Sequence, residues 1–193
     1  MRIGVFGGSF NPPHKMHENI ATYFIDNDIL DKVIFVPTGD NYKYKNNLVN
    51  AKDRYNMVKI ITDKNETFEV SDFEQKEKTV YTYQTLENFK KMYPNDLIYF
   101  VCGLDNLSYI DSWMNAEYIL ENFKILVIRR NTDDLDTVLN HLQKYKDNII
   151  VVDMEMCDIS STIIRENIKN GENNGYLDLD VLKYIKDNNL YID

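Results

Sequence analysis

The chain is poor in the residues that mark several large classes of protein. Its 193 residues include two cysteines, Cys102 and Cys157, which form neither a CxxC pair nor a disulfide framework. Both lie in or beside apolar runs, so we expect buried, reduced thiols. No apolar run approaches the roughly 18 residues of a membrane-spanning helix. Glycine and proline are also scarce, with seven and four residues, and no Pro/Gly-rich linker divides the chain.

Positive charge is in equally short supply. The 22 basic and 31 acidic side chains give a formal net charge of -9. Because nucleic acids and anionic membranes select basic surfaces, we expect neither as a partner, although a local pocket can still bind a small anion. Residues 2–6 are strand-like and do not resemble a secretory leader, so we expect a cytoplasmic protein. A homo-oligomer is one of the states that the sequence leaves open.

The apolar residues that the chain does have suffice for one core. A hydrophobic fraction of 44% supports a single domain over residues 1–193. Short β-rich runs alternate with segments of helical period, a pattern typical of βαβ units. We therefore predict a single α/β domain with a Rossmann-like, doubly wound parallel sheet and a C-terminal helical segment. The expected strands are residues 2–6, 32–36, 68–70, 97–102, 124–128 and 148–152, and the expected helices are residues 17–27, 51–62, 82–93, 133–146, 160–170 and 180–188.

The densest motif, GGSFNPPHKMH over residues 7–17, follows the first expected strand. Ligands of doubly wound sheets bind beyond the carboxyl ends of the strands, and paired glycines let backbone N–H groups approach phosphate oxygens. The spacing is neither GxGxxG nor a P-loop. His14 and His17 could donate to phosphates, bind a metal or simply pack. Because no nearby Cys or acidic residue completes a zinc site, we predict no protein-bound metal.

A second motif, ISSTIIRE over residues 159–166, follows the last expected strand. Ser160 or Ser161 could be an ordinary N-cap, with Glu166 in the turn that follows. Alternatively, the hydroxyls of Ser160, Ser161 and Thr162, the free helix N–H groups and Arg165 form an anion site. Both motifs follow parallel strands, so we expect them to face each other across one cleft.

Together the motifs resemble those of the bacterial nicotinate-nucleotide adenylyltransferases, a family of the nucleotidyltransferase superfamily that carries a GG-S/T-F-(N/D)-P-x-H-x-G-H loop and an I-S-S-T-x-I-R helix start. The resemblance extends to YTYQT at residues 81–85, GLD at residues 103–105 and the single tryptophan, Trp113. Two positions depart from the family. Met16 replaces the glycine of HxGH, and DNYK at residues 40–43 stands where the family usually has PPHK. A methionine at position 16 must swing aside or reshape the nucleotide pocket.

The resemblance implies adenylyl transfer from ATP to nicotinate mononucleotide, which gives nicotinate adenine dinucleotide and pyrophosphate in NAD biosynthesis. It also implies Mg²⁺ bound to the triphosphate. The implied catalytic residues are His14, His17 and Arg165; the implied ATP-binding residues are Gly7, Gly8, Ser9, Phe10, Asp105, Ser160, Ser161 and Thr162; and the implied residues for the mononucleotide are Lys43, Thr85 and Trp113.

Several alternatives stay open at this point. Lys43 could be a solvated loop lysine, Asp105 the N-cap of the next helix, and Trp113 a core residue. The acceptor could instead be nicotinamide mononucleotide, phosphopantetheine or an alcohol phosphate. Finally, the chain could be a non-catalytic nucleotide-binding protein in which Met16 has damaged the ATP cleft.

Overall fold

A computed structural model describes residues 1–40, 48–76, 79–129, 135–154, 159–172 and 175–192. Its sheet has six parallel strands in the order β3-β2-β1-β4-β5-β6. This order reverses direction between β1 and β4, as in doubly wound folds, and it confirms the predicted Rossmann-like α/β architecture. The strands are β1 (Arg2–Gly8), β2 (Lys32–Pro37), β3 (Phe68–Val70), β4 (Leu97–Gly103), β5 (Lys124–Ile128) and β6 (Ile149–Val152).

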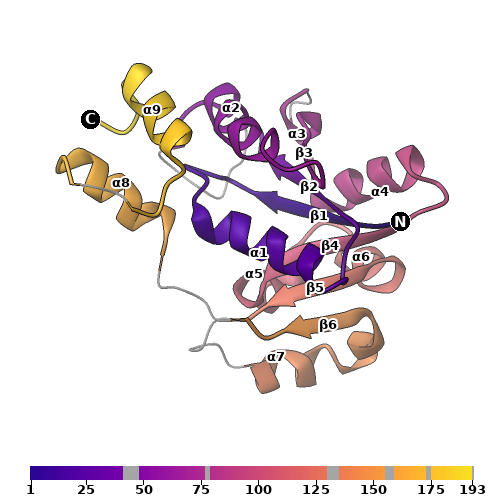
Figure 1. The fold of residues 1–193 in the computed structure, drawn as a ribbon. Helices are drawn as coiled ribbons and strands as arrows, with labels where there is room; N and C mark the ends of the chain where they lie inside the picture. Colours follow the sequence, from indigo (N-terminus) through magenta and orange to yellow (C-terminus); the bar gives the residue numbers. More distant parts are fainter. Residues whose placement is uncertain (41–47, 77–78, 130–134, 155–158, 173–174, 193) are drawn as a thin grey trace.

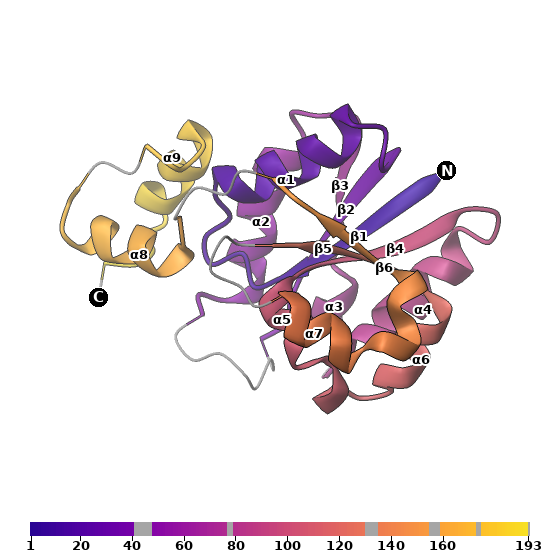
Figure 2. The ribbon, with the colours of Figure 1, turned by 90° about the horizontal axis from the view of Figure 1, so that it is seen from below.

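Helices cover both faces of the sheet (Figures 1 and 2). One face carries α1 (Lys15–Asp26) and α2 (Ala51–Thr62), and the other carries α4 (Thr82–Met92), α5 (Leu104–Ser108), α6 (Ala116–Asn122) and α7 (Leu135–His141). The short α3 (Phe73–Lys76) follows β3. Two 3₁₀ turns, η1 (Ile110–Ser112) and η2 (Gln143–Asn148), complete the second face. No described helix is long and apolar enough to cross a membrane.

Two apolar clusters fill the layers on either side of the sheet. Successive side chains of β4 alternate between them: Phe100 and Cys102 join the cluster beneath α4, while Val101 joins the cluster beneath α1. Strands that are buried on both faces read as continuous apolar runs, which is why the sequence revealed them. Cys102 is 3% exposed, as expected for a buried thiol, whereas Cys157 lies outside the described residues.

The last two helices, α8 (Ser161–Lys169) and α9 (Leu179–Asp187), lie beyond the carboxyl ends of the strands (Figure 1). A third apolar cluster fastens them to the domain. In it, Met57 and Ile61 of α2 join Ile164 of α8 and Val181 of α9. The predicted C-terminal helical segment is therefore packed onto α2, and this packing places the start of α8 near the carboxyl ends of the strands.

Some predicted elements differ in the structure. The helix predicted over residues 133–146 is the shorter α7, followed at Leu142 by the turn η2, and residues 133–134 lie outside the described part. Leu142 lies at the break and is 2% exposed, so the break accompanies the burial of an apolar side chain. The sequence did not predict α3, α5 or α6. These helices have four, five and seven residues, too few for a clear helical period.

Candidate active site

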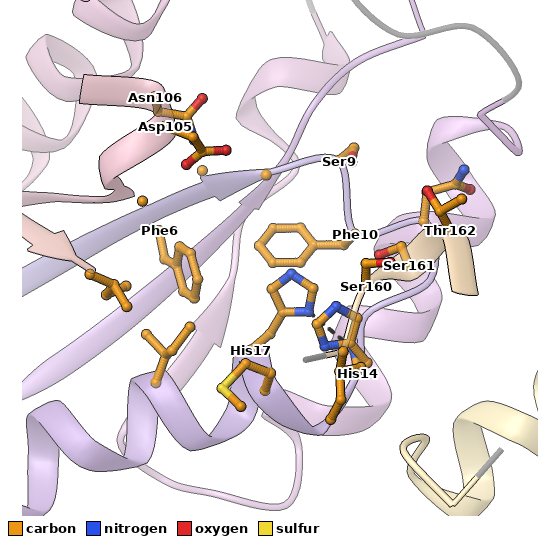
Figure 3. Close-up of a pocket in the computed structure, with 18 of the residues that line it drawn as sticks. Phe6, Ser9, Phe10, His14, His17, Asp105, Asn106, Ser160, Ser161 and Thr162 are labelled. Atoms are coloured by element: carbon orange, nitrogen blue, oxygen red, sulfur yellow. Dashed lines mark hydrogen bonds between the residues drawn. The ribbon is translucent and has the colours of Figure 1, made fainter. Parts of the chain in front are cut away.

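A pocket with a volume of about 470 Å³ lies at the carboxyl ends of the central strands (Figure 3). It combines both sequence motifs. All of the residues predicted to be catalytic or to bind ATP line it, namely Gly7, Gly8, Ser9, Phe10, His14, His17, Asp105, Ser160, Ser161, Thr162 and Arg165. The remaining lining is mainly apolar and includes Phe6, Met16, Ile20, Leu48 and Ile128. The structure thus forms the predicted cleft from segments about 150 residues apart.

The loop after β1 has an unusual backbone at Phe10, whereas Gly7 and Gly8, which we expected in the loop, form the end of β1 itself. A Cβ atom added to Gly8 would lie 3.0 Å from the Phe10 ring, so only glycine fits comfortably there. Phe10 itself has φ 46°, in the left-handed region that non-glycine residues rarely adopt. Its ring is 1% exposed and packs edge-on against Phe6, with centroids 5.7 Å apart. The folded-back loop therefore rests on a buried aromatic side chain.

The two histidines stand together where α1 begins. Their ring centroids are 3.8 Å apart, and Figure 3 shows both rings beside Phe10. The backbone N–H of His14, the N-cap residue, donates to Nδ1 of His17 at 3.1 Å. Because Nδ1 accepts this bond, the neutral His17 ring carries its hydrogen on Nε2. The bond from the His14 N–H therefore defines the tautomer of the neutral His17 ring.

The start of α8 is docked onto the histidine loop. Ser160 is the N-cap of the helix, and its Oγ accepts from the Ile163 N–H at 3.3 Å. Ser161 Oγ donates to the Pro12 carbonyl at 3.1 Å. Arg165 donates through Nη1 to the Asn11 carbonyl at 2.8 Å and through Nη2 to Thr162. The ordinary N-cap interpretation and the predicted anion site are thus compatible, because a guanidinium has five N–H donors.

Asp105 lies across the pocket from the histidines (Figure 3). Gly103 is the N-cap of α5, so the alternative in which Asp105 caps that helix is wrong. A Cβ atom on Gly103 would lie 2.4 Å from Asp105 Oδ1. The glycine therefore leaves room for the carboxylate to lie over the end of β4, at the rim of the pocket.

Two of the three residues predicted for the mononucleotide, Thr85 and Trp113, lie outside this pocket. Thr85 is 2% exposed on α4, and its hydroxyl donates to Glu74 Oε1 at 2.7 Å. Trp113 is half-buried and packs edge-on against Phe100, with centroids 5.9 Å apart. Neither residue lines the pocket described above. Lys43 lies outside the described residues, so its role stays a prediction.

Two residues support the loop through contacts that the sequence did not reveal. Arg54 of α2 is completely buried and donates to the Ser9 carbonyl at 3.0 Å. Tyr191 donates its hydroxyl to Asn11 Oδ1 at 2.9 Å, across 180 positions of the chain. Burial raises the pKa of the Tyr191 phenol, so it stays protonated and can donate. Helical spacing could have revealed Arg54, since it shares the buried face of α2 with Ala51 and Val58.

The pocket brings together groups that attract anions in a chain of net charge -9. The N-terminal ends of α1 and α8 both border it, and helix N-termini attract anions through their free N–H groups. Arg165 adds a full positive charge, and Asp105 is the carboxylate in the lining. Among the described residues, no group of three or more His, Cys, Asp or Glu side chains could hold a metal ion. These groups are of the kind that bind an anion such as a phosphate ester, as the sequence predicts.

Comparisons with known proteins agree with this geometry. Residues 5–167 match the family model described as Cytidylyltransferase-like. The chain is 41% identical over 174 residues to a probable nicotinate-nucleotide adenylyltransferase of Clostridium tetani, covering 87% of each chain. It is 39% identical over 195 residues to the corresponding protein of Clostridium acetobutylicum, covering 97% of this chain and 98% of the relative.

The fold is also found among solved structures. The Plasmodium falciparum nicotinic acid mononucleotide adenylyltransferase complexed with NaAD superposes with a TM-score of 0.83 at 22% identity, covering 98% of this chain and 97% of that one. At this identity the likeness concerns the fold alone. The family rests instead on the matching model and on the two clostridial relatives. The chain therefore belongs to the cytidylyltransferase-like family and, within it, to the nicotinate-nucleotide adenylyltransferases.

Proposed function

We propose that the protein transfers the adenylyl group of ATP to nicotinate mononucleotide and releases pyrophosphate, a step of NAD biosynthesis. One observation carries this proposal: the loop with His14 and His17 and the helix start with Ser160 and Arg165 line one pocket. The clostridial relatives named for this activity cover nearly the whole chain. A neighbouring fold was solved with NaAD, and the same Plasmodium protein with APC.

The reaction needs alignment and charge stabilisation more than a protein nucleophile. An oxygen of the mononucleotide phosphate attacks the α-phosphorus of ATP, and the bond from that phosphorus to the bridging oxygen of the β-phosphate breaks. His17 would donate from Nε2 to phosphate oxygens as negative charge develops, with His14 beside it. We assign Ser9 and Phe10 N–H groups to the α-phosphate. The start of α8 would hold the β- and γ-phosphates as they leave.

Mg²⁺ is part of the proposal, and the donor set of the pocket fits it. Magnesium is usually held by one or two carboxylates together with substrate phosphates and water. We assign Asp105, the carboxylate that the lining offers, to a ribose hydroxyl of ATP, so water and the triphosphate would supply the ligands of the ion. When bound, the ion would neutralise charge on the phosphates. The protein groups described above would still set the orientation.

The acceptor side of the proposal rests on Thr85, Trp113 and Lys43. Trp113 packs against the apolar cluster on the face of the sheet that α4 and α6 cover, and Thr85 lies on α4 itself. For Thr85 to meet the carboxylate of nicotinate, its hydroxyl must leave Glu74. The relatives' names favour nicotinate mononucleotide over nicotinamide mononucleotide and phosphopantetheine. The cytoplasmic location likewise stays a prediction.

An acceptor panel tests the function directly. Purified protein is incubated with ATP and Mg²⁺, and pyrophosphate release is measured with nicotinate mononucleotide, nicotinamide mononucleotide, phosphopantetheine or no acceptor. We expect turnover only with both ATP and nicotinate mononucleotide. Preference for another acceptor would replace the substrate assignment. Calorimetric binding of ATP with no turnover on any acceptor would instead support the non-catalytic alternative.

A further inference from the structure

Arg54 is buried to an extent that is unusual for arginine. Its side chain is 0% exposed, although it is one of five arginines in an acidic chain. Arginine is almost never fully buried unless it is paired, because desolvating a guanidinium is costly. Burial lowers the pKa of Arg54, and the negative charge of Asp40 opposes this effect. A buried charge of this kind needs a structural or functional reason.

The contacts of Arg54 converge on the loops that frame the pocket. Nη1 donates to the Ser9 carbonyl at 3.0 Å and to Thr38 Oγ1 at 3.1 Å. Nε donates to the Val49 carbonyl at 2.9 Å, and Nη2 lies 3.5 Å from Asp40 Oδ1. The planar guanidinium therefore joins the loop after β1 to both flanks of the segment between β2 and α2. Lysine, with a single nitrogen, could not reproduce this set of contacts.

The hydrogen bond from Arg54 to the Ser9 carbonyl also sets the direction of the Phe10 N–H, which belongs to the same peptide group. The Ser9–Phe10 peptide is trans, and in a trans peptide the C=O and the following N–H point in opposite directions. Because Arg54 holds the Ser9 carbonyl, the Phe10 N–H must point away from Arg54. Ser9 and Phe10 line the pocket and Arg54 does not, so Arg54 acts on the loop from behind.

Phe10 also needs such support. Its φ of 46° persists only when surrounding contacts hold it, since bulky residues disfavour this conformation. Packing against Phe6 and Phe35, with centroids 5.7 Å away in each case, fixes the side chain. Arg54 fixes the peptide group before it. Together these contacts hold the side chain of Phe10 and the peptide group that precedes it.

We propose that Arg54 is a positioning residue, which aims the Phe10 N–H at the α-phosphate of ATP by holding the Ser9 carbonyl. The proposal rests on the function proposed above. Arg54 touches no substrate. It acts only through the orientation of one peptide group, and its loss would misdirect a donor without removing any residue of the pocket.

Substitution of Arg54 by methionine tests this role. Misplacing a catalytic group by about 1 Å typically costs about 100-fold, and we expect a loss of this size in kcat/KM for ATP in Arg54→Met. The matched control is Arg2→Met, because Arg2 lies at the opposite end of β1 and pairs with Asp31. Thermal unfolding of each variant is measured first, and kinetics are run well below every transition. An ATP kcat/KM for Arg54→Met equal to that of the wild type would overturn the proposal.

A second readout separates positioning from general loss of structure. The two diastereomers of ATP with sulfur on the α-phosphate are compared with ATP in each protein. Sulfur is a poor acceptor, so in the wild type the diastereomer with sulfur at the Phe10 N–H should react more slowly. In Arg54→Met this discrimination should shrink, because the donor is no longer aimed at that atom. An unchanged ratio in the variant, with a lower rate for every nucleotide, would show a merely structural role and overturn the proposal.

Milder variants keep the test decisive if Arg54→Met does not fold. Thr38→Val removes one acceptor of Nη1, and we expect a loss of about 2- to 10-fold in kcat/KM for ATP. Thr62→Val is its control, because Thr62 is also a buried threonine but donates to the Lys59 carbonyl. Equal kinetics for the two variants, together with wild-type kinetics for Arg54→Lys, would overturn the proposal.

Failure of the proposed function can be told apart from failure of this inference. If the wild type shows no turnover, calorimetry with α,β-methylene-ATP replaces kinetics. Binding at least about 10-fold weaker in Arg54→Met than in Arg2→Met would support the positioning role, since the aimed donor also binds the ground state. Equal affinities would overturn it.

Discussion

The half-buried Glu74 of α3 should make the stability of this fold depend on pH near neutrality. Burial raises the pKa of its carboxyl to about 7, from an ordinary value of 4.5, against the opposing effects of the Thr85 hydroxyl and the Arg54 charge. The folded protein therefore binds the Glu74 proton more tightly than the unfolded chain does. Its contribution is fully present below pH 4.5 and is lost as the pH rises through 7.

The size of the effect follows from the shift. Each pKa unit corresponds to about 1.4 kcal/mol, so a shift from 4.5 to about 7 has an upper limit of about 3 kcal/mol. Glu74 keeps some contact with solvent, and we expect about 1–3 kcal/mol. Glu74→Gln retains an acceptor for Thr85 but cannot ionise. The unfolding free energy of this variant minus that of the wild type should therefore rise by about 1–3 kcal/mol between pH 5 and pH 8.

Urea unfolding followed by circular dichroism at pH 5, 6, 7 and 8, at constant ionic strength, measures this gain. Glu66→Gln is the matched control, because Glu66 is exposed and its replacement should give nearly the same difference from wild type at every pH. The reasoning fails if the difference between Glu74→Gln and the wild type is the same at pH 5 and pH 8. It also fails if that difference falls as the pH rises.

Three further substitutions address the pocket and its supports. His17→Ala should lower kcat about 10²–10³-fold with little change in melting temperature. His141→Ala, which changes a histidine outside the pocket lining, should leave kcat unchanged in the same steady-state assay, and equal effects of the two variants would contradict the assignment. Tyr191→Phe removes the bond to Asn11 and should lower the unfolding free energy by about 0.5–1.5 kcal/mol in urea titrations; no loss would mean that this contact is dispensable. Met16→Gly should lower the unfolding free energy by about 3–5 kcal/mol, because Met16 is 3% exposed in the apolar cluster beneath α1. It should not raise kcat, and a rise in activity would support the alternative in which Met16 has damaged the ATP cleft.

The fold was predictable because its strongest signals are local. Strands β3 and β5 have the predicted bounds, and α2 begins and ends at the predicted residues. The break after α7 was not predictable, because it depends on where Leu142 finds room in a core that other segments form. Helices as short as α5 are held by packing rather than by a periodic pattern of their own.

The candidate site likewise contains residues that the sequence revealed and residues that it did not. The loop of residues 7–17 and the start of α8 stood out because each concentrates its chemistry within a few positions. Arg54 did not stand out, since its partner Ser9 lies 45 positions away and arginine on a helix usually faces solvent. Thr85 was linked to a substrate by resemblance, yet its described partner is Glu74, which no local pattern connects to it.

The bond between Tyr191 and Asn11 bears on how the protein acquires its activity during synthesis. The ribosome makes the loop that carries Asn11 180 positions before it makes Tyr191. Strands β1 and β2 can pair long before then, and Arg54 can reach Ser9 as soon as α2 forms. The loop therefore gains its supports in sequence, and the last arrives only with the segment that follows α9. Nascent chains that stop short of this segment should fold their sheet first and complete the nucleotide site last.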